Sequence, residues 1–204
     1  MPKTQNTAAQ QSTQQKYFGR FVVRGTVVRK IRTKSALIFA VATGNSTAQK
    51  TDFPRFVAIT NAEELDNIFK IGDRVTVTAH MRTSKKYPNG TLVPDSVVVE
   101  KNKMDAAFAG EKFLADKNEA VIRGQVAGAP YSPNDSVTLL SLKVDLADGS
   151  YAYLRTVAFG RVAQTIRRKK AGEDMEAVGY IRTKSFKETG DTAKNQSIVI
   201  ISAR

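Results

Sequence analysis

Two stretches of the chain decide its fold: Tyr153-Leu-Arg-Thr-Val-Ala-Phe-Gly160 and, further on, Gly179-Tyr-Ile-Arg-Thr-Lys-Ser-Phe186. Both have a weaker copy upstream. Moving back by 100 positions, without a gap, sets Arg155 on Arg55, Val157-Ala158 on Val57-Ala58, Gly172 on Gly72, and Arg182-Thr183 on Arg82-Thr83. A repeat of this length indicates one structural unit used twice.

The chain is strongly basic. Its 204 residues include 32 Lys and Arg against 19 Asp and Glu, a net charge of +13. Such a charge favours a polyanionic partner, either nucleic acid or an acidic membrane surface. The membrane is the weaker alternative, because no stretch approaches the roughly 18 apolar residues of a spanning helix. The start, Met1-Pro-Lys-Thr-Gln, also lacks the apolar run of a signal peptide, so we expect a soluble, cytoplasmic protein.

Composition excludes most catalytic chemistry. The chain has no cysteine, which rules out disulfides, thiol catalysis and zinc fingers, and His80 is its single histidine. The acidic residues are scattered singly, apart from the pairs Glu63-Glu64 and Glu173-Asp174. A carboxylate-only metal site would need clustered acids. We therefore expect no enzyme activity, no metal and no cofactor.

The first half of the chain has the pattern of strands. Residues 1–16 contain no aromatic or branched aliphatic residue and are expected to be a disordered tail. Period-two alternation then begins at Tyr17 and places Arg20 and Arg24 opposite Phe21 and Val23. Expected strands cover 17–28, 36–42, 53–60, 74–83 and a stretch through 97–99, with a basic turn over 29–34 and a helix over 61–70 capped by Asn61.

The second half repeats this order, with expected strands over 120–127, 137–146, 150–160, 175–184 and 198–201 and a helix over 162–170. Three strands, a short helix and two strands is the order of the OB fold. The sequence therefore predicts an all-β protein of two tandem five-stranded OB-fold barrels, each with a short helix between strands three and four. Its expected parts are a tail (1–16), a first barrel (17–100), a linker (101–117) that helps to pack the barrels, and a second barrel (118–204).

These motifs resemble the bacterial and phage single-stranded DNA-binding proteins, the SSB family. In the second unit, Asn118-Glu-Ala-Val-Ile-Arg-Gly-Gln-Val resembles the family's first strand, and the two opening stretches resemble its third and fourth strands. The first unit matches through Val23-Arg-Gly-Thr-Val and Gly72-Asp-Arg-Val. The resemblance covers most of both units.

The resemblance implies that bases stack on aromatic residues of strands three and four. In the second unit these positions are Tyr153, Phe159 and Phe186, whereas the first unit has Phe53, Ile59 and Lys86, with Tyr87 one residue on. The first unit also carries 13 basic and 7 acidic residues over 17–100, a net charge of +6. We therefore expect the second barrel to stack more and the first to rely more on phosphate contacts.

Basic residues beside these aromatics complete the expected site. Phe53 with Arg55, and Tyr153 with Arg155, lie two apart on a strand and so share one face. Phe21, Phe39, Phe56 and Phe69 are expected in the core, and Arg167 to Lys170 at a solvated helix end. The expected nucleic-acid-binding residues are Arg24, Phe53, Arg55, Arg82, Lys85, Lys86, Tyr87, Arg123, Tyr153, Arg155, Phe159, Arg182, Lys184 and Phe186.

By this resemblance, the protein coats single-stranded DNA largely without sequence specificity during replication, recombination or repair. Two chains would together present the four barrels that are usual in the family. The sequence stops at Arg204 without the family's acidic tip, so recruitment of replication enzymes through a tail is not expected, and a phage or plasmid origin is favoured. Two alternatives stay open: an RNA-binding or recombination-mediator OB-fold protein, and a scaffold for protein contacts.

Overall fold

The computed structural model describes residues 16–45, 50–84, 90–183 and 196–204. Strands dominate these ranges and three short helices accompany them, none long and apolar enough to cross a membrane. Buried and exposed side chains alternate along most strands, because successive side chains of a strand point to opposite faces. The expected all-β class is confirmed.

The first barrel is formed by the first half of the chain. Its five main strands are hydrogen-bonded in a closed circuit, in which the second main strand pairs with both the first and the third main strand. A short additional strand extends the second one. The elements are β1 (Phe18–Arg32), β2 (Leu37–Asn45), the short β3 (Lys50–Asp52), β4 (Arg55–Ala58), α1 (Ala62–Ile68), β5 (Arg74–Arg82) and β6 (Thr91–Glu100), paired in the order β2-β4-β6-β5-β1 and closed by β1–β2.

The second barrel has the same plan. A short strand again flanks the second main strand, this time before it in the chain. The elements are β7 (Lys117–Val126), the short β8 (Tyr131–Asn134), β9 (Val137–Asp145), β10 (Tyr151–Phe159), α3 (Gly160–Arg167), β11 (Asp174–Thr183) and β12 (Gln196–Ala203), paired in the order β7-β11-β12-β10-β9 and closed by β7–β9.

In both barrels the third and fifth main strands run parallel, whereas the other paired strands run antiparallel. The parallel pairs are β4 with β6, at Phe56 and Leu92, and β10 with β12, at Val157 and Val199. This closure, with a helix between strands three and four, is that of the OB fold. The expected pair of five-stranded barrels is confirmed.

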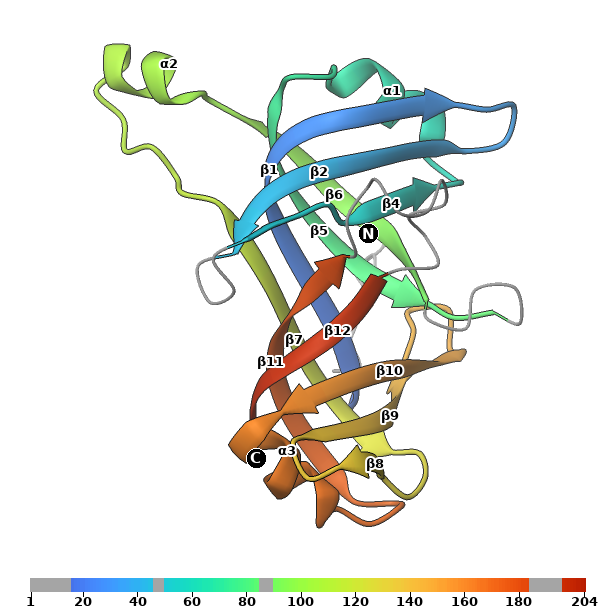
Figure 1. Ribbon diagram of the computed structural model, residues 1–204. Helices are drawn as coiled ribbons and strands as arrows, with labels where there is room; N and C mark the ends of the chain where they lie inside the picture. Colours follow the sequence, from blue (N-terminus) through green and yellow to red (C-terminus); the bar gives the residue numbers. More distant parts are fainter. Residues whose placement is uncertain (1–15, 46–49, 85–89, 184–195) are drawn as a thin grey trace, which may run out of the picture.

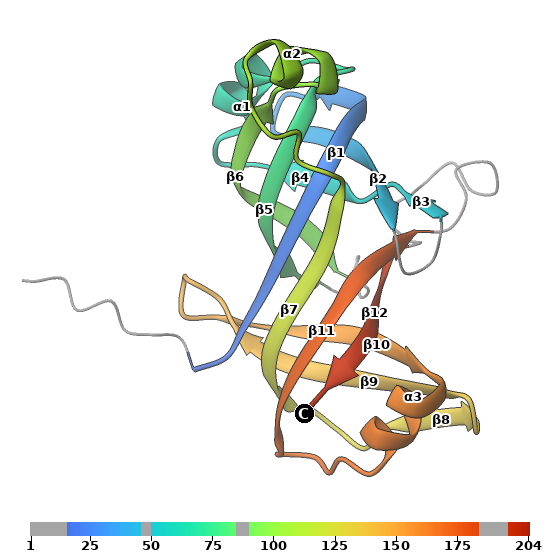
Figure 2. The ribbon, with the colours of Figure 1, turned by 90° about the vertical axis from the view of Figure 1, so that its left-hand side faces the viewer.

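The first strands of the two barrels join them into one sheet. β1 pairs antiparallel with β7 from Phe18 opposite Arg123 to Arg24 opposite Lys117. The strands β6, β5, β1, β7, β11 and β12 therefore follow one another without a break, and Figure 2 shows them side by side along the molecule. The hydrogen bonds of this ladder fix one barrel directly against the other.

β1 is longer than the alternation predicted. The basic segment over 29–34 was expected to be a turn, but Arg29 to Arg32 continue the strand after a bulge and pair with β2. Lys30 explains part of the extension, because its Nζ donates to the carbonyl oxygens of Asp66 and Phe69 at the end of α1. A cation at the C-terminal end of a helix is favourable, so the lysine ties the hairpin to α1.

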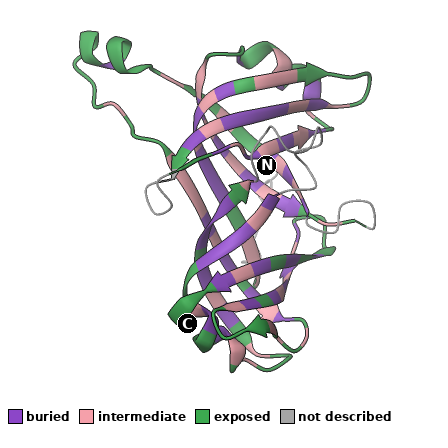
Figure 3. Cartoon of the chain, viewed as in Figure 1, coloured by how far each residue is buried: buried purple, intermediate pink, exposed green. Residues whose placement is uncertain are grey.

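The core of the first barrel is aromatic, as predicted. Phe21, Phe39, Phe56 and Phe69 are all buried, and the ring of Phe39 lies 5.0 Å from that of Phe56 and 4.9 Å from that of Phe69. Figure 3 shows the buried positions alternating along the strands of both barrels. The predicted cap of α1 was wrong: Asn61 precedes the helix, but its side chain makes no capping hydrogen bond.

The linker between the barrels packs on the first barrel. Arg74 of β5 donates to the carbonyl of Leu114, pairs with Asp116 at 2.7 Å, and lies over the ring of Phe113. The helix α2 (Lys103–Phe108) stands away from both barrels, and its Phe108 is 85% exposed (Figure 1). The apolar linker residues were expected to help pack the barrels together, but the ladder between β1 and β7 joins the barrels directly.

Candidate nucleic-acid interface

The outer face of β10 carries exposed aromatic rings. Alternation buries Ala152, Leu154 and Ala158 and directs the intervening side chains outward. Tyr151, Tyr153 and Phe159 are 56%, 44% and 44% exposed, and Arg155 lies between the last two on the same face. Since large aromatic side chains are usually buried, three exposed rings on one strand favour a binding surface.

β9 supplies the neighbouring row of the same face. Tyr153 lies opposite Lys143 and Arg155 lies opposite Ser141 in the β9–β10 ladder. The Nζ of Lys143 sits 4.5 Å from the ring centre of Tyr151, whose ring meets that of Tyr153 edge-on at 5.5 Å. The cation and the two rings thus contact one another on the exposed face.

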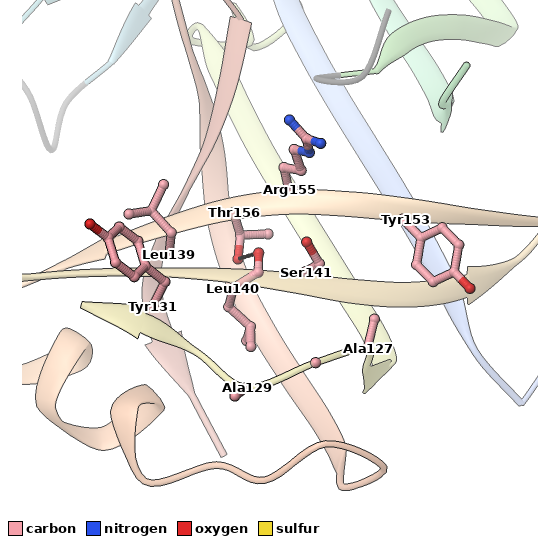
Figure 4. Close-up of a pocket in the computed structure, with 10 residues that line it drawn as sticks. Ala127, Ala129, Tyr131, Leu139, Leu140, Ser141, Tyr153, Arg155 and Thr156 are labelled. Carbon is pink, nitrogen blue, oxygen red and sulfur yellow. Dashed lines mark hydrogen bonds between the residues drawn. The ribbon is translucent and has the colours of Figure 1, made fainter. Parts of the chain in front are cut away.

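A groove of about 620 Å³ runs across this face. It is lined by β8, β9 and β10 together with the loop from Ala127 to Ala129. Figure 4 shows the rings of Tyr131 and Tyr153 at its two ends, with Ser141 and Thr156 between them. Tyr131 is 66% exposed, so both ends of the groove present an aromatic surface to solvent.

Arg167 holds β8, the strand of Tyr131, in place. Its guanidinium donates to Ser132 Oγ at 3.1 Å, to the carbonyl of Asn134 at 2.8 Å and to Asp135 at 3.0 Å. This residue was expected at a solvated helix end. Instead it fixes the short strand against α3, and with it one end of the groove.

Arg155 provides positive charge beside the groove. Its side chain extends from β10 away from the Ala127–Ala129 loop (Figure 4), and among the described residues no carboxylate pairs with it. A guanidinium without an acidic partner is available for a phosphate. The structure thus brings together three of the expected site residues, Tyr153, Arg155 and Phe159, on one strand.

Arg24 and Arg123 lie elsewhere, on the paired first strands. The guanidinium of Arg24 donates to Thr76 Oγ1 at 2.8 Å and lies 3.8 Å from Glu100, and Arg123 lies 3.6 Å from Glu176. Arg24 also reaches the linker carbonyl of Ala115. Both arginines take part in structural contacts, and their expected role on phosphates remains a prediction.

Phe53, Arg55 and Arg82 lie where the two barrels meet. The backbone amides of Phe53 and Arg55 donate to side chains of the second barrel, and Arg82 pairs with Asp148 at 2.7 Å. Arg182 is exposed at the end of β11, two residues beyond the buried Tyr180. The remaining expected site residues, Lys85, Lys86, Tyr87, Lys184 and Phe186, lie outside the described residues.

Sequence reasoning missed Tyr131, Lys143 and Tyr151 as members of the aromatic face. Tyr151 had a readable signal, because it lies two residues before Tyr153 on the same strand. Tyr131 had none: it belongs to the short β8, and only the pairing of Tyr131 with Leu139 on β9 carries it to this face. Within the described residues, no three acidic or histidine side chains group as metal ligands.

Comparison with known proteins supports the fold. No family model and no curated protein sequence matches the chain. Among solved structures, the wild-type single-stranded DNA-binding protein from Thermus aquaticus superposes with a TM-score of 0.66 and 13% identity, over 93% of each chain. A deletion mutant of that protein gives 0.66 and 12%, over 93% of this chain and 94% of that chain.

The fold resembles that of this SSB protein over nearly the whole length of both chains. The two proteins thus share the arrangement of two complete barrels in one chain. The SSB-like tandem arrangement that the sequence motifs indicated is confirmed at the level of the fold. In an OB fold, the surface of strands two and three binds oligonucleotides. The aromatic face of β9 and β10 occupies that position in the second barrel.

Proposed function

We propose that this protein binds single-stranded DNA, largely without sequence specificity, and protects exposed strands during replication, recombination or repair. One observation carries the proposal: the β9–β10 face, which is the oligonucleotide-binding face of an OB fold, presents exposed tyrosines around a groove. The shared fold with the Thermus aquaticus protein, which its name describes as binding single-stranded DNA, supports it. The protein acts by binding and is not an enzyme.

The side chains of this face explain why binding would not depend on the base sequence of the DNA. Every base has a flat π surface, so a ring such as Tyr153 or Tyr131 stacks on any of them. Lys143 and Arg155 stand among the rings, where they can meet the phosphates between stacked bases. Contacts to phosphates position a strand and carry no sequence information. Exposed single strands occur where DNA is copied, so the cytoplasm or nucleoid of a bacterial cell is the proposed location.

Titration with dT oligomers tests this function, with matched RNA and duplex as competitors. We expect the single DNA strand to bind most tightly and its affinity to fall with salt, with a log–log slope of about 0.7 for each phosphate neutralised. Tighter binding of RNA would point to an RNA-binding protein. An affinity that does not respond to salt, or no binding to any of the three, would point to a protein scaffold.

A charge variant sharpens this titration. Arg155→Gln should reduce the salt slope by about 0.7, because one phosphate contact is lost. Lys103→Gln is the matched control, since Lys103 is exposed on α2, which stands away from both barrels. Equal salt slopes for both variants would show that Arg155 does not contact a phosphate.

We also propose that two chains associate to present four barrels. The outer side of β7, β11 and β12 carries a second groove, of about 470 Å³, lined in part by Phe18, Val121 and Val178. Apolar side chains that are accessible in such a groove, here beside the charged Arg123, Glu176 and Arg204, favour a protein contact. Sedimentation equilibrium should give twice the 22.3 kDa chain mass, and Val178→Glu should return the monomer. A monomer at micromolar wild-type protein would contradict the association.

A further inference from the structure

The two barrels make the same contact with each other, once in each direction. Thr83 follows β5 and Thr183 ends β11, and the two lie 100 positions apart in the repeat. Thr183 Oγ1 accepts a hydrogen bond from the backbone amide of Phe53 at 2.8 Å, and Thr83 Oγ1 accepts one from the amide of Tyr153 at 3.2 Å. Phe53 and Tyr153 are themselves repeat partners. Each barrel therefore holds the start of the other barrel's third strand.

The amide of Tyr153 is available to Thr83 because β12 does not pair with this part of β10. β12 pairs with β10 only from Thr156 to Ala158, so the first half of β10 extends past β12. That half reaches β5 of the first barrel, and the end of β11 in turn reaches β3 (Figure 2). A backbone N–H at the boundary of two folded units needs a partner. Here the partner is a side chain of the opposite barrel.

The contact at Phe53 is reinforced by buried groups. The amide of Thr183 donates to Asp52 Oδ1 at 2.9 Å, and the amide of Arg55 donates to Gln196 Oε1 at 2.7 Å. Asp52 is only 3% exposed and Gln196 only 2%. These hydrogen bonds fix the end of β3 and the start of β4 to β11 and β12.

The contact at Tyr153 has fewer supports. Next to it, Arg82 pairs with Asp148, which lies in the β9–β10 hairpin. Hydrogen bonds from the side chain and amide of Ser150, with a smaller contribution from Arg82, hold the pKa of Asp148 below its usual value, so this acid keeps its charge near neutral pH. Both partners of the pair are exposed, where ion pairs contribute little. Within this contact, the Thr83 hydroxyl is therefore the main group of the first barrel that holds the Tyr153 backbone.

We propose that Thr83 and Thr183 are positioning residues that combine the two barrels into one composite site for a single strand of nucleic acid. Each threonine fixes an aromatic residue at the start of the opposite barrel's third strand, so that Tyr153 and Phe53 present their rings in a fixed relation across the junction. One continuous strand then contacts both barrels. This inference rests on the proposed function, which supplies the ligand.

The first experiment needs no DNA. Thr83→Val removes the acceptor and keeps the shape, whereas Thr83→Ser keeps the hydroxyl. In the free full-length protein, the amide of Tyr153 should exchange with solvent about two- to tenfold faster in the valine variant and at the wild-type rate in the serine variant. Thr78→Val is the control, because Thr78 lies on the same strand and its hydroxyl makes no hydrogen bond within the described residues. An unchanged Tyr153 rate in Thr83→Val would overturn the positioning role.

The second experiment links the positioning to the ligand through a double-mutant cycle with dT oligomers. Thr83→Val should weaken binding about two- to tenfold, and should add nothing once Tyr153→Ala has removed the ring that the threonine positions. An additive effect would overturn the composite site, since Thr83 would then act without Tyr153. Should wild-type protein bind no dT, the proposed function fails and the composite site with it, while amide exchange still reports the contact between barrels.

Discussion

Replacing Tyr131 and Tyr153 together by alanine is expected to weaken binding of a dT oligomer by about thirtyfold or more. Both rings line the β9–β10 groove, at opposite ends of it. Base–aromatic stacking contributes about 1–3 kcal/mol for each ring, so two rings contribute about 2–6 kcal/mol. Fluorescence anisotropy of a labelled oligomer at one fixed salt concentration measures the loss.

Two controls separate stacking from other effects. Tyr131→Phe with Tyr153→Phe keeps both rings and should bind nearly as the wild type does. Phe108→Ala removes an exposed ring on α2, which stands away from the groove, and should leave affinity unchanged. If the phenylalanine variant lost as much affinity as the alanine variant, the hydroxyl groups rather than the rings would carry binding. Phe53→Ala should cost less than Tyr153→Ala, because Phe53 is the more buried.

The substitution Gly179→Ala is expected to destabilise the protein by about 3 kcal/mol or more. Gly179 lies at a bulge where β11 shifts its register against β12. A methyl group at this position would come 2.0 Å from the carbonyl oxygen of Val199 and 2.9 Å from its carbonyl carbon. Both atoms belong to backbone in a ladder, so relief requires the two strands to separate.

Urea or thermal unfolding measures this loss, with Gly128→Ala as the matched control. A methyl group on Gly128 would meet nothing within 4 Å, so that variant should unfold like the wild type. For a chain of this size, about 3 kcal/mol corresponds to a melting temperature lower by about 6–12 °C. Similar curves for both variants would show that β11 and β12 separate there at little cost.

Local pattern was enough to predict the barrels and one row of the candidate site. The repeat and the order of elements indicated two OB folds, and strict alternation along β10 placed Tyr153, Arg155 and Phe159 together. These predictions depend on neighbours within a few residues, which the sequence displays directly. The side of the strand on which a ring lies is a local property.

Contacts between distant segments could not be predicted in this way. The threonines of the repeat were visible in the sequence, but nothing in either copy indicated that Thr83 would bond to Tyr153 and not to its own barrel. Tyr131 reaches the groove through a short strand that Arg167 anchors from α3. Arg24 had the alternation of a surface arginine, yet Thr76 and Glu100 engage it across neighbouring strands. For Thr83, Arg167 and Arg24 the partner lies more than 30 residues away, and local periodicity does not report it.

The ladder between β1 and β7 has a consequence for either half taken alone. Residues Phe18 to Arg24 are paired there with Lys117 to Arg123, so each barrel covers the other's open edge. A fragment ending at Glu100 would expose that row of amides and carbonyls, which is a template for pairing with any other strand. Because both barrels belong to one polypeptide, the free edge of β1 pairs with β7 before either strand can pair with another molecule. The duplication therefore protects the chain against aggregation.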